Sequence, residues 1–133
     1  MASELKVDKF TGVTTAGSIL VTGEGNSTTT NLQQGLAKSW VHFDGTGTIS
    51  TRESLNVSSL TDSSSGQYYV NYNNNMGTGD YAVLACDRGN DQHISSNEPA
   101  NSASQVRLFS VDWTSTTFED SSMVMGAVLG DLA

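Results

Sequence analysis

The densest group of residues that could do chemistry is the segment Asp87-Arg-Gly-Asn-Asp-Gln-His93. Asp87, Asp91 and His93 are residue types that bind metal ions. Their spacing matches no established ligand pattern, and the segment lacks the alternating acidic or amide groups and the distal Glu of an EF-hand loop. We therefore interpret it as a hydrated loop whose Asp and Asn residues favour turns. The sequence predicts neither a metal site nor a cofactor.

Catalysis by acids, bases or nucleophiles is the second chemistry that the residue types allow. A serine hydrolase needs a serine, a base and an orienting acid, and the chain has no G-x-S-x-G motif. A glycan hydrolase needs two carboxyl groups beside the scissile bond, and spacing singles out no such pair. We interpret His42 as a strand residue that faces solvent or a subunit contact, and we predict that the protein is not an enzyme. The acidic residues considered are Asp44, Glu53, Asp112, Glu119 and Asp120.

Aromatic rings offer a third chemistry, because a ring face can stack on a sugar. Alternation of apolar and polar residues predicts that most of the aromatic side chains lie in the core. Tyr69 is the best candidate for an exposed ring, although a packed or interfacial tyrosine explains its position more simply. The candidate ligand-binding residues are therefore Tyr69 and, in the long polar segment Arg88–Ser104, Arg88, Asp91 and His93.

The single cysteine, Cys86, excludes a disulfide within the chain. It ends the apolar run Tyr81-Ala-Val-Leu-Ala-Cys86. A thiol in such a run predicts a buried small hydrophobic side chain, because a reactive thiolate needs cationic neighbours.

The charge of the chain excludes several classes of partner. The 133 residues include six Lys and Arg against 14 Asp and Glu, which gives a formal net charge of −8. Nucleic acids and anionic membranes both select clustered basic residues, and the six here are scattered. No apolar run approaches the ~20 residues of a membrane span, and Met1–Asp8 lacks the apolar region of a signal peptide. We expect no nucleic-acid partner, no membrane insertion, and synthesis in a cytoplasm without a signal peptide.

Residues 1–31 differ in composition from the rest of the chain. Their few apolar residues are separated by Gly- and Thr-rich pieces, which cannot form a core by themselves. We predict an N-terminal arm that is either flexible or ordered by strand pairing with other chains, since unpaired strands seek partners. Two alternating pieces, Glu4–Asp8 and Ser18–Thr22, are its candidate strands. Its candidate assembly residues are Leu5, Val7, Phe10, Ile19 and Val21.

The remaining residues, 32–133, predict an all-β domain. The segment Asn31–Lys38 predicts a short helix or coil, and from there the apolar pattern has a period of two residues. The run Asp80–Cys86 is almost continuously apolar, which predicts a strand buried on both faces. Turn signals separate the strands, so we expect an antiparallel, jelly-roll-like β-sandwich. Strands are expected at Lys38–Phe43, Thr48–Val57, Gln67–Asn73, Asp80–Cys86, Gln105–Trp113 and Met123–Leu129, with loops at Asp44–Gly47, Asp62–Gly66 and Arg88–Ser104.

Several motifs follow one another between Asn31 and Tyr72. They are Leu32-Gln-Gln-Gly-Leu-Ala-Lys-Ser-Trp40, Phe43-Asp-Gly-Thr-Gly47, Arg52-Glu-Ser54 and Asn56-Val-Ser-Ser59. In this order they resemble the small virion and tail-fibre-like β modules of marine bacteriophages of the cyanophage or pelagiphage type. The start, Glu4–Asp8, is similar to the attachment segments of phage fibre proteins.

The resemblance implies a virion structural protein without catalytic residues, commonly a homotrimer. A long fibre shaft is missing from this chain, which favours a fibre or appendage subunit. We expect the protein to be located in the virion, to bind itself and other capsid or tail proteins, and to dock through its arm while the sandwich faces outward. Two alternatives are a capsid decoration (cement) protein and a receptor module that binds a host surface glycan through the Arg88–Ser104 loop.

Overall fold

The computed structural model describes residues 4–15, 19–23, 25, 28–33, 35–87 and 101–133, together with the backbone of residues 92–96. Every strand among them pairs in antiparallel fashion, and this part of the chain contains no helix. The predicted all-β class and β-sandwich are confirmed. The chain divides into two compact units, Met1–Leu36 and Ala37–Ala133, so the division falls after Leu36 and not after Asn31. No helix of the described residues is long and apolar enough to cross a membrane.

The first unit contains a single described hairpin, in which β1 (Leu20–Thr22) pairs with β2 (Thr29–Asn31). Residues Glu4–Asp8, expected to be flexible or to pair with other chains, form no strand within the single chain, whereas β1 lies within the alternating piece Ser18–Thr22. The backbone NH of Leu32 donates to the carbonyl of Ile19 at 2.9 Å and closes the hairpin. The helix considered after Asn31 does not form. Instead the Asn31 side chain accepts a hydrogen bond from the Gln33 NH at 2.8 Å, which makes a turn.

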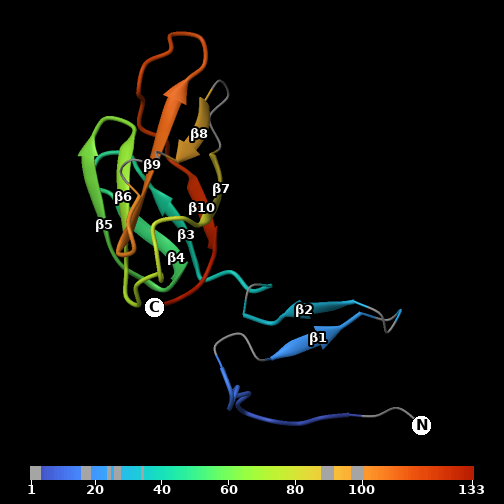
Figure 1. The fold of residues 1–133 in the computed structure, drawn as a ribbon. Helices are drawn as coiled ribbons and strands as arrows, with labels where there is room; N and C mark the ends of the chain where they lie inside the picture. The colour runs from blue at the N-terminus through green and yellow to red at the C-terminus, as the bar shows by residue number, and fades with distance from the viewer. Residues whose placement is uncertain are drawn as a thin grey trace. The chain divides into compact units, whose positions relative to one another are not determined.

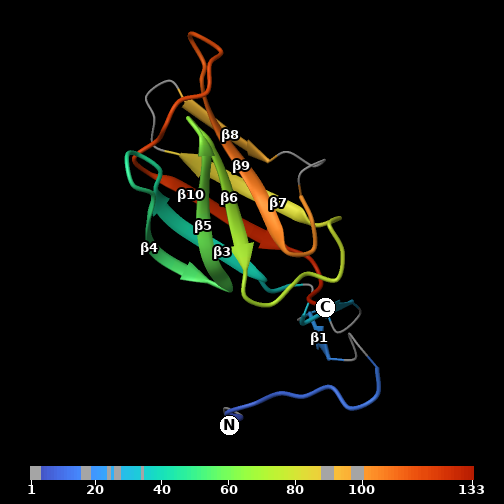
Figure 2. The ribbon, with the colours of Figure 1, turned by 90° about the vertical axis from the view of Figure 1, so that its left-hand side faces the viewer.

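The second unit consists of two sheets of four strands each. Figures 1 and 2 show the sheets stacked face to face, with the second sheet in front in Figure 2. In spatial order, the first sheet contains β4 (Ser50–Leu55), β3 (Ser39–Asp44), β10 (Val124–Leu129) and β7 (Ala82–Asp87). The second contains β5 (Val57–Ser64), β6 (Gln67–Tyr72), β9 (Gln105–Asp112) and β8 (Gln92–Ser96).

The core lies between the two sheets. It is built from every second residue of strands in which inward-facing and outward-facing residues alternate. In β3, Val41 and Phe43 are buried, and in β6, Tyr68, Val70 and Tyr72 are buried, as alternation predicts. The rings of Phe43 and Tyr68 meet edge to face with centroids 5.1 Å apart, a favourable geometry for an aromatic pair. The core is completed by Met76, Val106, Leu108, Val124 and Val128.

The predicted single strand Thr48–Val57 is wrong. The chain turns at Asn56, whose φ is +58°, and passes from β4 of the first sheet into β5 of the second. Asparagine tolerates this left-handed conformation better than most residues. A register shift in the pairing of β3 with β4 also moves the exposed Leu55 opposite Trp40, on the outer face and not in the core.

Three further predictions about strands and loops are wrong. Strand β7 exists, but only Val83 and Ala85 pack against the core, while Leu84 and Cys86 are exposed. The expected buried cysteine therefore faces solvent. The predicted Arg88–Ser104 loop contains strand β8, which pairs with β9 at the edge of the second sheet. The predicted Asp62–Gly66 loop is likewise shorter, because β5 continues to Ser64.

Candidate functional site

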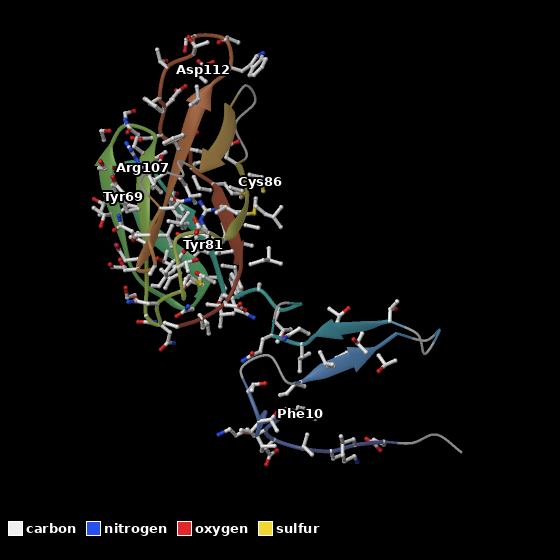
Figure 3. The ribbon with its side chains drawn as sticks, viewed as in Figure 1. Phe10, Tyr69, Tyr81, Cys86, Arg107 and Asp112 are labelled. Carbon is white, nitrogen blue, oxygen red and sulfur yellow. The ribbon has the colours of Figure 1, made fainter. Side chains whose placement is uncertain are left out.

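The candidate assembly residues lie in the first unit and are mostly exposed. Leu5 has 75% of its surface accessible and Phe10 has 61%, while Val7 and Val21 are also exposed and Ile19 is half-buried. The side chain of Phe10 is labelled in Figure 3. A two-stranded hairpin is marginally stable at best without a packed face. The first unit therefore presents apolar side chains that its own described residues do not cover.

The candidate ligand-binding residues do not form one loop. Arg88 and Asp91 lie outside the described residues. The backbone of His93 belongs to β8, where it is the register partner of Val111. Tyr69 lies in β6 of the same sheet, with Arg107 of β9 as its direct cross-strand partner. The sheet, and not a loop, therefore positions Tyr69.

Arg107 organises a cluster on the outer face of the second sheet, which we call the Arg107 platform. It consists of the half-buried Gln67, Tyr69, Arg107 and Phe109 and of the exposed Phe118. The guanidinium carbon lies 5.5 Å from the ring centroid of Tyr69 and 5.4 Å from that of Phe109. Both distances permit cation–π attraction. The guanidinium also donates a hydrogen bond to the side-chain oxygen of Gln67. The Phe118 ring extends the platform, with its centroid 5.6 Å from that of Phe109.

The platform combines two chemical abilities. Aromatic rings offer apolar faces, and the guanidinium between them, whose Nε is buried and one of whose terminal nitrogens donates to Gln67, can attract a carboxylate with its remaining N–H groups. Sequence reasoning singled out Tyr69 but missed Arg107. Only the register of β6 with β9 places the arginine opposite the tyrosine, and one sequence does not reveal that register.

Two of the acidic residues considered for catalysis, Asp112 and Asp44, accept hydrogen bonds within turns. The carboxylate of Asp112 accepts hydrogen bonds from the Thr114 NH at 2.6 Å and the Thr114 hydroxyl at 2.7 Å. These bonds, with a further one from the Ser115 NH, lower the pKa of Asp112 to about 2. Asp44 accepts the corresponding bonds from Thr46, which together with Arg52 lower its pKa.

Asp120 holds a hairpin and a core tyrosine together. Its carboxylate accepts hydrogen bonds from the Gly66 NH at 2.6 Å and from the Tyr68 hydroxyl at 3.3 Å. Burial, with smaller contributions from Asp120, raises the pKa of Tyr68 to about 12. Of the other predicted residues, His42 lies in β3 with its Nε2 at 3.4 Å from a guanidinium nitrogen of Arg52, and Glu53 is exposed in β4.

No metal-binding cluster stands out in the part of the chain that the structure describes. Three or more His, Cys, Asp or Glu residues do not come close enough there to hold an ion. Comparison with protein-family models, with curated proteins and with solved structures yields no match. The exposed apolar side chains of the first unit and the Arg107 platform are therefore the features from which a function can be argued.

Proposed function

We propose that this chain is a structural protein of a bacteriophage virion, a fibre- or appendage-type subunit that docks on the particle through residues 1–36. The observation that carries the proposal is the first unit, in which Leu5, Val7 and Phe10 are exposed. A segment of this kind loses conformational entropy when it becomes ordered, so it needs apolar partner surface to be stable. The resemblance of Asn31–Tyr72 to phage fibre modules supplies the class of particle.

The contribution of these three side chains to the binding free energy can be estimated from their burial. Full burial of each contributes roughly 1.5–3 kcal/mol. Loss of even ~1.4 kcal/mol weakens binding tenfold. Replacing all three by serine is therefore expected to lower occupancy on the particle at least tenfold at limiting subunit concentration.

The test uses tagged protein supplied in a host infected with the phage that encodes the chain. The wild-type chain, the triple variant Leu5→Ser, Val7→Ser, Phe10→Ser, and the control Thr11→Ser, Thr14→Ser are compared on banded particles. Wild type and control should band with the particles, and the triple variant should not. A wild-type chain that never bands would contradict the virion role. If the triple variant bands as strongly as wild type, docking through the first unit is contradicted, while the virion role is not.

A second candidate function is recognition of a host surface glycan, and the Arg107 platform is the observation that favours it. Its rings and guanidinium suit a sugar that carries a carboxylate, such as a uronic or sialic acid. The full chain should bind such glycans on an array. Tyr69→Ala should weaken binding about tenfold, equivalent to ~1.4 kcal/mol, whereas Tyr69→Phe, which keeps the ring, should bind like wild type. Absence of binding to every acidic glycan would contradict this function.

Two finer expectations belong to the same proposal. A homotrimer is the oligomeric state that the resemblance implies, and a capsid decoration protein is the alternative position on the particle. Electron microscopy of particles carrying the tagged chain distinguishes tail from capsid. A tag found only over the capsid shell would replace the fibre-type assignment by the decoration role.

A further inference from the structure

The outer face of the first sheet is apolar, although it faces solvent. Register aligns Leu55, Trp40, Ala127 and Leu84 in one row across all four strands of this sheet. Leu84 is 63% accessible and Leu55 is 48% accessible. An antiparallel sheet with one wet face normally alternates apolar and polar residues. The row breaks that rule, which indicates a face adapted to burial.

A second row beside the first is apolar in its β10 and β7 half and polar in its β3 and β4 half. It contains Glu53, His42, Met125 and Cys86, of which Glu53 is the one formally charged residue. Figure 3 shows Cys86 on the opposite side of the sandwich from Tyr69 of the Arg107 platform. We call these two rows the outer apolar face. Beside the second row, the Arg52 guanidinium lies 3.4 Å from His42 and pairs with Asp44 at 3.1 Å, so these two neighbouring charges offset each other.

From these features we infer that the outer apolar face is the surface through which copies of this chain associate. The inference rests on the proposed structural role only in that such a subunit acts in several copies. Chains with a net charge of −8 repel one another, which favours contact between copies where acidic side chains are few. A basic partner would instead be drawn to the acidic remainder of the surface.

The size of the face suits weak self-association. Strands of six residues in β3, β4, β7 and β10, about 4.8 Å apart and about 3.4 Å per residue, span roughly 19 by 20 Å. Two such faces in contact cover about 760 Å² together, less than the ~1,000 Å² of a stable specific interface, so we expect a weak association that forms at high concentration. Flat sheets stack about 10 Å apart, and a symmetric pair requires only that the face complements itself.

Cys86 supplies a native probe of this surface. It is the single cysteine of the chain, and it is exposed on the outer apolar face. A maleimide or disulfide reagent reaches it in a separate chain and is excluded when another copy covers the face. The rate of thiol labelling therefore reports which surface is used, whereas mass alone reports only that association occurs.

The experiment uses the purified full-length chain from about 1 μM to about 1 mM. Light scattering should give a multiple of the 14.1 kDa chain mass, and the Cys86 labelling rate should fall at least tenfold with rising concentration. Leu84→Arg should stay monomeric and be labelled at a constant rate, because the buried charge would be unpaired. Ser64→Arg, on exposed β5 of the other sheet, is the matched control and should behave like wild type.

Each contrary result overturns the inference. A wild-type chain that remains monomeric at every concentration shows that another protein, or nothing, covers the face. Unchanged association of Leu84→Arg, or Cys86 labelling that does not depend on concentration, places the interface elsewhere. Circular dichroism and urea midpoints confirm that both variants are folded. A monomeric chain that still bands with particles would contradict this inference and leave the virion role standing.

Discussion

Replacement of Asn56 tests how the chain passes from one sheet to the other. Asn56 lies between β4 and β5 with φ at +58°. Its side-chain NH₂ donates to the carbonyl of Lys38 at 3.1 Å and to that of Asn74 at 2.9 Å, and its side-chain oxygen accepts from the Asn74 NH at 2.7 Å. One side chain thus connects the corner to the start of β3 and to the loop after β6.

The expected loss of stability follows from these contacts. A hydrogen bond contributes about 0.5–1.5 kcal/mol net, so the three bonds together are worth roughly 2–3 kcal/mol at this partly exposed site. Glycine adopts the left-handed conformation freely, whereas alanine is strained there by about 1 kcal/mol. Asn56→Gly should therefore lower the free energy of unfolding by roughly 2–3 kcal/mol, and Asn56→Ala by about 1 kcal/mol more.

Urea unfolding followed by circular dichroism measures both losses, with Asn75→Ala, an exposed side chain in the same loop, as the control. The control should differ from wild type by less than about 0.5 kcal/mol. If both Asn56 variants fall within that margin, the corner is not held by this side chain. A glycine variant less stable than the alanine variant would refute the argument from φ.

Three further predictions concern packing and ionisation. Gly45→Ala should cost about 1–3 kcal/mol in urea unfolding, because a Cβ there overlaps the Tyr68 ring, and a smaller loss for Gly77→Ala, whose Cβ would make only ordinary contacts from 3.6 Å, is the control. Asp112, with its pKa lowered to about 2, stabilises the fold above pH ~4 and loses that contribution as pH falls toward ~2. Thermal midpoints of Asp112→Asn should therefore change less over this interval than those of wild type, and equal slopes would contradict the assignment. Burial raises the pKa of Tyr68, Tyr72 and Tyr81, so their stabilising contribution is present below pH ~10 and is lost at higher pH. Most tyrosinate absorbance should appear together with unfolding, and ionisation of all four tyrosines in a folded protein at pH ~10 would be inconsistent with this burial.

The strands that the sequence predicted correctly have one face buried in the core and one face exposed to solvent. In β3 and β6 the alternation of Val41 and Phe43, and of Tyr68 and Val70, shows directly which residues enter the core. Strand β8 has no such pattern, since Gln92–Ser96 contains a single apolar residue, and its place depends on backbone pairing with β9. A strand specified by its neighbour's hydrogen bonds leaves little trace in its own sequence.

The errors at β4 and β7 have different physical causes. A register shift in β4 lies between Thr51 and Leu55, and after it the side chains that pointed inward point outward. A prediction that assumes a strict period of two residues therefore places Leu55 on the wrong face of the sheet. In β7 the apolar run predicts burial on both faces, while the single chain buries only one. The left-handed corner at Asn56 had a readable signal, because asparagine is enriched at such positions.

The surfaces that carry the proposals lie on different structural elements, and this makes them separable by experiment. Leu84→Arg changes β7 of the first sheet, Tyr69→Ala changes β6 of the second, and the serine variants change residues 5–10 of the first unit. Effects of substitutions without shared partners add, whereas coupled sites deviate from additivity. If particle docking uses the first unit alone, Leu84→Arg should leave the affinity of a single copy for the particle unchanged. It should lower occupancy only to the extent that several linked copies raise avidity. A variant in β7 that abolishes docking of even a single copy would show that the outer apolar face contacts the particle itself.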